Sequence, residues 1–221
     1  MTDSGKKAKG NFFDPDSRLI FFMTKAGQVI ILNVVWLLTC IPVFTIGTAT
    51  TSLYYAIIKN IRRNRGYPLA EYFTSFKRTF VKGSIFTVVA MLWLLLLYHL
   101  WTVALDMAGD TGTFLKKLYL TLMFLSVAVL LYLFPVLSRF TMDMVSMVKL
   151  SFVMSIRFIG YTILMLMGTA ALTILWIYYL PMPVIFFLPG AWCYVCTFMI
   201  EKALKKYMPS SEGNEDAWYY E

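Results

Sequence analysis

From residue 158 to residue 200 the chain reads FIGYTILMLMGTAALTILWIYYLPMPVIFFLPGAWCYVCTFMI, which is 43 residues without Asp, Glu, Lys or Arg. Three further charge-free stretches cover residues 26–58, 83–105 and 118–138. A bilayer core about 30 Å thick needs roughly 20 helical residues, so each stretch can supply at least one membrane helix. The 221-residue chain is 59% hydrophobic and only 14% charged, which argues against a soluble domain. The sequence therefore predicts an all-α, polytopic membrane protein.

Prolines divide the two longest stretches. Pro181 and Pro183 separate residues 158–180 from 184–200, because proline lacks the backbone donor that a helix needs. Pro42 and Gly47 lie in the middle of residues 26–58, where they either kink one helix or turn the chain between segments 26–42 and 43–58. Segments 83–105 and 118–138 complete a set of about six, or five if residues 43–58 re-enter without crossing.

The positions of Lys and Arg favour the turn. With six segments, 18 of the 20 basic residues lie on one side, in the N-terminal segment, loops 59–82 and 139–157, and the C-terminal tail. A single crossing at residues 26–58 instead moves the five N-terminal basic residues to the other side. Since cytoplasmic loops are rich in Lys and Arg, we expect both termini to be cytoplasmic. A cleavable leader within residues 1–49 is a competing interpretation, but it would export the basic loop 59–82.

These segments predict one membrane domain, residues 26–206, between a cytoplasmic N-terminal segment, 1–25, and a flexible cytoplasmic tail, 207–221. We expect three helical hairpins joined by two cytoplasmic interfacial helices. The first is residues 69–82, where aromatic residues recur at helical spacing. The second falls within the loop 139–157. The +8 net charge is then mostly a matter of topology, with no sign of nucleic acid binding.

The interfacial helix 69–82 is either a passive connector or a docking surface, since an aromatic amphipathic helix is a recurrent recognition element. The candidate docking residues are Tyr72, Phe73, Phe76, Lys77 and Phe80.

Small and hydroxyl residues mark candidate sites of helix packing. Pro42, Thr45 and Gly47 lie at the first turn, and glycine and threonine let helices approach closely in lipid. A solute path lined by the threonines of residues 45–51 is the alternative. Arg139 is four residues from Asp143, and we expect the two to form a structural ion pair.

Few residues could carry chemistry. His99 is the only histidine, and it is either a packing residue or a relay near the outer boundary. Cys193 and Cys196 form a Cys-x-x-Cys within an apolar segment, where a reactive thiolate or a metal site lacks support. We find no catalytic motif and expect no enzyme activity, no cofactor and no metal.

Several motifs resemble the YesL-like family of bacterial integral membrane proteins. These are IPVFTIG at residues 41–47 with Ala49 and Tyr54-Tyr55, the aromatic pattern of residues 72–80, and Phe134-Pro135 with the sequence SRF at residues 138–140. The resemblance extends from about residue 12 to residue 205. It implies a protein of the bacterial cytoplasmic membrane, from a family of unknown function whose members are typically encoded beside carbohydrate importers of the ATP-binding cassette type.

The leading functional expectation is a non-catalytic accessory subunit, associated through the lipid bilayer with the permease subunits of such an importer. The alternative is a self-sufficient small transporter or channel that uses the threonine-rich segment and His99.

Overall fold

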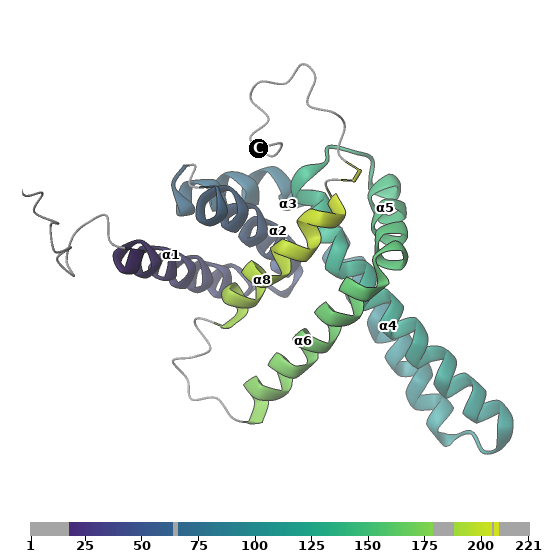
Figure 1. Ribbon diagram of the computed structural model, residues 1–221. Helices are drawn as coiled ribbons and strands as arrows, with labels where there is room; N and C mark the ends of the chain where they lie inside the picture. The colour runs from purple at the N-terminus through teal and green to yellow at the C-terminus, as the bar shows by residue number, and fades with distance from the viewer. Residues whose placement is uncertain (1–17, 64–65, 179–187, 205, 208–221) are drawn as a thin grey trace, which may run out of the picture.

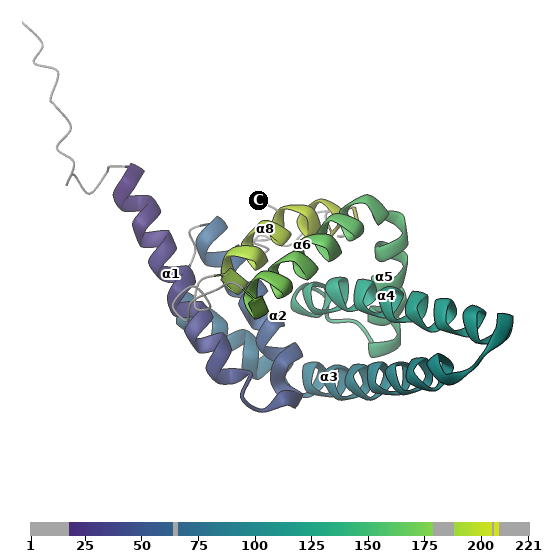
Figure 2. The same ribbon diagram turned by 90° about the horizontal axis from the view of Figure 1, so that it is seen from below.

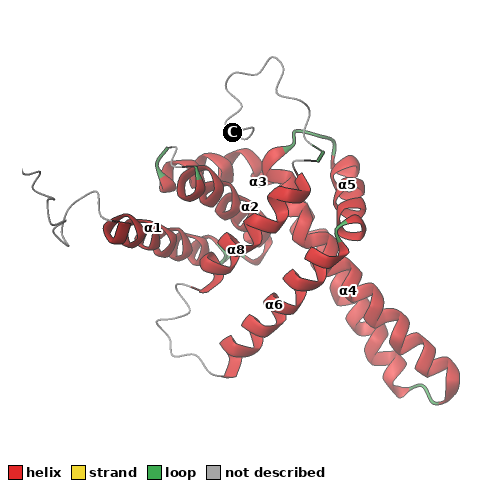
Figure 3. Ribbon diagram, in the orientation of Figure 1, coloured by secondary structure: helices red, strands yellow, loops and turns green. Residues whose placement is uncertain are grey.

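The computed structural model describes residues 18–63, 66–178, 188–204 and 206–207. Within these ranges every regular element is helical and none is a strand (Figure 3). The elements are α1 (Arg18–Thr39), the 3₁₀ helix η1 (Val43–Thr45), α2 (Ile46–Ala56), the π-helical η2 (Ile57–Arg62), α3 (Pro68–Asp106), α4 (Gly109–Arg139), α5 (Met144–Arg157), α6 (Ile159–Tyr178) and α8 (Leu188–Leu204). This confirms the all-α class.

The chain turns between α1 and α2. Pro42 has an extended backbone and precedes η1, so α1 ends at Thr39. Trp36 Nε1 donates to Thr50 Oγ1 at 3.4 Å, and Lys25 Nζ donates to the carbonyl of Asn60 at 3.0 Å. These two contacts join residues progressively farther from the turn, so α1 runs antiparallel to α2 and η2.

Helix α2 is the buried centre of the molecule, and α1, α3, α4 and α8 all contact it. Almost every one of its residues is buried. Glycines permit this packing, since a Cβ at Gly47 would collide with Thr87 and Phe134, and a Cβ at Gly83 would collide with Thr48. The expected segment 43–58 is therefore an interior helix that continues through η2 to Arg62.

Helix α3 joins two elements that the sequence separates. Residues 69–82, expected as an interfacial helix, and residues 83–105, expected as a span, form one helix of 39 residues. At 1.5 Å per residue it is about 58 Å long. No proline interrupts this stretch, and Gly83 packs against Thr48 instead of breaking the helix. The two expected segments are therefore parts of one continuous helix.

Helices α3 and α4 form a hairpin that projects from the rest of the molecule (Figures 1 and 2). Only Met107 and Ala108 separate them, and Gly109 has a positive φ of 89° at the turn. Helix α4 begins nine residues before the expected segment 118–138 and includes Pro135 without ending there.

Among the described residues, α3 and α4 are long and apolar enough to cross a membrane. Residues of α5 and α6 meet this criterion only together, and a bend of 93° separates the two helices. Residues 23–39 of α1 form a shorter apolar helix. These helices indicate a membrane protein with two or three candidate spans, which is a coarser result than the six segments expected. The proposed turn at Pro181 and Pro183 lies outside the described residues.

Candidate functional site at a buried charge cluster

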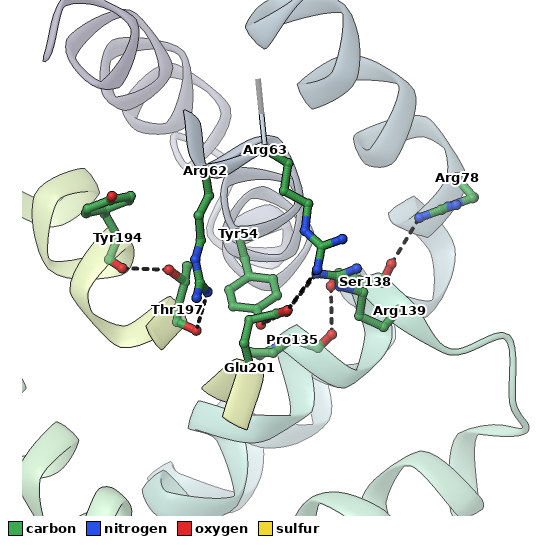
Figure 4. Close-up of polar contacts among 10 residues, drawn as sticks. All are labelled: Tyr54, Arg62, Arg63, Arg78, Pro135, Ser138, Arg139, Tyr194, Thr197 and Glu201. Carbon is green, nitrogen blue, oxygen red and sulfur yellow. Dashed lines mark hydrogen bonds and ion pairs between the residues drawn. The ribbon is translucent and has the colours of Figure 1, made fainter. Parts of the chain in front are cut away.

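Charged side chains meet inside the protein where η2, α4 and α8 converge (Figure 4). Arg139 Nη2 lies 2.6 Å from Glu201 Oε1, and the two side chains are only 2% and 4% exposed. Arg63 Nη2 lies 3.9 Å from the other oxygen of the same carboxylate. Tyr54 Oη donates to Glu201 Oε1 at 3.1 Å. One buried carboxylate therefore links α2 and the residue after η2 to α4 and α8.

The energetics of this charge cluster (Tyr54, Arg63, Arg139 and Glu201) depend on every partner being present. Removing charged groups from water is costly, and an ion pair recovers that cost only when further hydrogen bonds satisfy it. Glu201 has two guanidinium groups and one phenol around it. The cluster therefore fixes the ends of several helices relative to one another.

Two more arginines surround the cluster and bind backbone carbonyls. Arg62 Nη1 donates to Thr197 O at 3.2 Å, and its guanidinium lies 4.3 Å from the centre of the Phe198 ring. Arg78 Nη2 donates to Ser138 O at 3.1 Å. Because Ser138 is in the last turn of α4, Arg78 places positive charge where the helix dipole is negative.

A second ion pair ties η2 to the start of α3. Lys59 Nζ lies 2.7 Å from Glu71 Oε2, with both side chains about one-fifth exposed. Burial lowers the pKa of Lys59, but the hydrogen bond and the charge of Glu71, together with Tyr55, outweigh burial and leave that pKa raised. Lys59 is therefore charged throughout the physiological pH range.

The cluster corrects one expectation from the sequence. Asp143 was expected to pair with Arg139, whereas the ion pair formed by Arg139 is with Glu201, 62 residues away. Sequence reasoning missed Glu201 because it lies one residue beyond the charge-free stretch. A signal was present, since Ile200, Ala203 and Leu204 around it are apolar and are also buried.

The candidate docking residues are divided between the two sides of α3. Tyr72 is fully buried and its hydroxyl lies 2.6 Å from Thr39 Oγ1, so it faces the bundle. Phe76 is half-buried and stacks on Tyr72. Phe73, Lys77 and Phe80 are exposed.

Of the candidate packing residues at the first turn, Thr45 and Gly47 are buried, whereas Pro42 is exposed. Thr45 Oγ1 donates to the carbonyls of Thr39 and Pro42, both at 2.6 Å. Gly47 N donates to Thr87 Oγ1 at 3.0 Å, which brings the backbone of α2 directly against α3.

The structure does not bring His99 to the threonine-rich segment. His99 is exposed and lies 12 residues beyond Thr87 on α3, about 18 Å along the helix. The hydroxyls of Thr48 and Thr51 donate to backbone carbonyls. These threonines therefore connect helix turns and neighbouring helices.

Cys40, Cys193 and Cys196 are free thiols, and no group of His, Cys, Asp and Glu among the described residues could hold a metal ion. A cavity of about 420 Å³ lies beside the cluster, between α1, α2, α4, α6 and α8. Its walls are almost entirely apolar, and its two indole N–H groups already bind Thr50 and Thr169.

The described part of the chain is all-helical and includes helices long and apolar enough to cross a membrane. A family model described as "Protein of unknown function, DUF624" matches residues 29–100, from α1 through most of α3. The match confirms the family resemblance over residues 29–100, which include the motifs at residues 41–55 and 72–80 but not those at residues 134–140. No curated protein and no solved structure matches the chain.

Proposed function

We propose that this protein is a non-catalytic accessory subunit of a carbohydrate importer of the ATP-binding cassette type, in the bacterial cytoplasmic membrane. In this proposal, six segments in three hairpins cross or enter the membrane, and both termini are cytoplasmic. The protein acts by packing against the permease subunits of the importer.

The observation that carries the proposal is the two-sided character of α3 at residues 72–80. One side is fixed to the bundle through Tyr72, Ser75 and Thr79, which are buried. The opposite side presents Phe73, Lys77 and Phe80, three exposed residues at a spacing of four and three. A rigid helix with exposed aromatic residues suits recognition by another protein, because little conformational entropy is lost on binding.

The gathering of basic residues supports the proposed topology. Arg62 and Arg63, the early part of α3 with Arg78, the end of α4 with Arg139 and the end of α8 meet around Glu201. These segments are the ones assigned to the cytoplasmic side by the positive-inside rule. The choice of partner rests on the family resemblance, and the exposed side of α3 gives that partner a contact surface.

The proposal is tested by affinity purification of the full chain from its native host in mild detergent, with mass spectrometry of associated proteins. We expect importer permease subunits at near-stoichiometric yield. Replacing Phe73 and Phe80 by Ala should lower that yield at least several-fold. Phe114→Ala is the matched control, since Phe114 is 65% exposed near the distant turn between α3 and α4. A chain that purifies without importer subunits contradicts the proposal.

The alternative, independent transport, predicts solute flux into liposomes that contain only this protein. Two observations argue against a solute path through the threonine-rich segment and His99. His99 is distant from these threonines, and the cavity beside the cluster has apolar walls. Flux by the purified protein alone would nevertheless favour this alternative over the accessory role.

A further inference from the structure

A second cavity opens between the two arms of the α3–α4 hairpin and is covered at one end by α5. Its volume is about 450 Å³, within the range of roughly 300–1,000 Å³ that is typical of ligand pockets. Phe86 and Trp93 line it from α3, Leu122 and Leu133 from α4, and Phe152 from α5. It is separate from the charge cluster and from the exposed side of α3 used in the proposed function.

The lining of this groove, called here the hairpin groove, is apolar apart from Trp93, Ser126 and Lys149. Trp93 Nε1 donates to Ser126 Oγ at 3.0 Å, and Ser126 in turn donates to the carbonyl of Leu122. These polar groups are therefore satisfied within the protein. The remaining polar residue of the lining is Lys149, which is exposed and forms no ion pair within the described part of the chain.

Lys82 adds positive charge at the same end of the groove. It lies one helical turn before Phe86, and its ammonium donates to the carbonyl of Met142, two residues before α5 begins. That bond places the start of α5 beside the Phe86 end of the groove. The ammonium of Lys82 donates there to a neutral carbonyl, and neither Lys82 nor Lys149 forms an ion pair within the described part of the chain. The exposed Asp143, next to Met142, is the acidic residue of the segment 139–157.

The length of the groove matches half of a bilayer. From Leu122 to Leu133 on α4 the rise is 11 residues, or about 16 Å. The hydrocarbon core of a bilayer is about 30 Å thick, so the groove spans about one leaflet. An acyl chain of one leaflet would lie along its apolar walls, with the attached headgroup beside Lys149.

We propose that the hairpin groove binds one acyl chain of an anionic phospholipid, with the lipid phosphate on Lys149 and Lys82. Charge complementarity selects an anionic headgroup, because the cationic end of the groove borders the interface where phosphates lie. The apolar walls accept the chain without leaving a polar group of the protein unpaired. The site is independent of any importer partner.

The test uses the purified full chain in detergent with equal amounts of phosphatidylglycerol and phosphatidylcholine that carry identical acyl chains. Native mass spectrometry counts the bound molecules of each lipid. We expect wild-type protein to retain about fivefold more phosphatidylglycerol, in line with the attraction of one basic residue to an anionic lipid. Lys149→Gln should lower this ratio at least twofold, because only Lys82 then remains beside the phosphate, and Lys149→Arg should preserve it.

Two further variants separate the headgroup from the chain. Val89→Trp, at a groove position that is 59% exposed, should fill the groove and reduce retention of both lipids. Lys117→Gln is the matched control, because Lys117 is exposed on α4 and is not part of the groove lining. Equal retention of the two lipids by wild type, or equal effects of Lys117→Gln and Lys149→Gln, would overturn the proposal.

Discussion

Helix α2 is compared here with the far end of the α3–α4 hairpin, residues 88–126, which is called the outer arm. Together they show the opposite of the distribution in a water-soluble protein, because polar residues are buried and apolar residues are exposed. Helix α2 contains three threonines, two tyrosines, one serine and one glycine among its 11 residues, and it is buried. Leucine is the commonest residue of the outer arm, and Val89, Leu92 and Phe124 are each more than half exposed. In water this arrangement would be unfavourable. In lipid, apolar side chains gain little from meeting one another, and close backbone contact with interhelical hydrogen bonds drives packing instead.

The two regions also have different roles. The interior holds its helices together through fixed contacts, including the hydrogen bond from Gly47 N to Thr87 and the charge cluster around Glu201. The outer arm offers apolar surface to its surroundings. Substitutions in the buried interior should therefore change the stability of the protein strongly, and substitutions in the outer arm should change it little.

The largest expected effect is that of Glu201→Ala. This change removes the Glu201 carboxylate beside the buried Arg139 and the partly buried Arg63, which should cost about 3–5 kcal/mol of stability. Denaturant unfolding in detergent micelles measures the loss. Glu71→Ala is the matched control, because its ion pair with Lys59 is more exposed and should contribute about 1 kcal/mol or less. Equal effects of the two changes would show that burial of the cluster is unimportant.

The next effect is that of a larger side chain at Gly47. Gly47→Leu places side-chain atoms where Thr87 and Phe134 lie, and overpacking of this kind should cost about 1–3 kcal/mol or more. Thermal unfolding followed by circular dichroism provides the measurement. Gly160→Leu serves as the control, since a Cβ at Gly160 has no neighbour within 4 Å. A Gly47→Leu protein as stable as Gly160→Leu would contradict close packing of α2 on α3.

A smaller effect is expected from Thr87→Val, which keeps the shape of the side chain but removes its oxygen. The buried Gly47 N–H then loses its acceptor, at a cost of about 1–3 kcal/mol. Thr113→Val, at the exposed start of α4, should change stability little. Unfolding midpoints of both variants in the same detergent test this difference, and a null result for Thr87→Val would weaken the role given to interior hydroxyls.

The smallest effect should follow from shortening the outer arm's side chains. Leu92→Ala and Leu95→Ala alter residues that are 61% and 54% exposed, so each should change stability by about 0.5 kcal/mol or less. The measurement is again unfolding in detergent. A loss of several kcal/mol would mean that the outer arm is packed against another chain and is not exposed to lipid.

The sequence predicted some elements better than others, for physical reasons. The turn at Pro42 was recognisable because proline restricts its own backbone, and α1 does end just before it. The sequence did not show that the interfacial helix 69–82 and the span 83–105 form one helix, because a change from amphipathic to apolar character does not interrupt backbone hydrogen bonding. For the docking residues, periodicity identified the helix but did not show that Tyr72 faces inward.

The sequence by itself determined the class of the protein, since long charge-free stretches are stable as helices in lipid whatever their partners. It also determined that basic residues flank these stretches. Only the tertiary structure decided which polar groups lie inside. Arg139 and Glu201 are 62 residues apart, and their pairing depends on how α4 and α8 pack. The same holds for α2, whose burial follows from neighbours that no local pattern specifies.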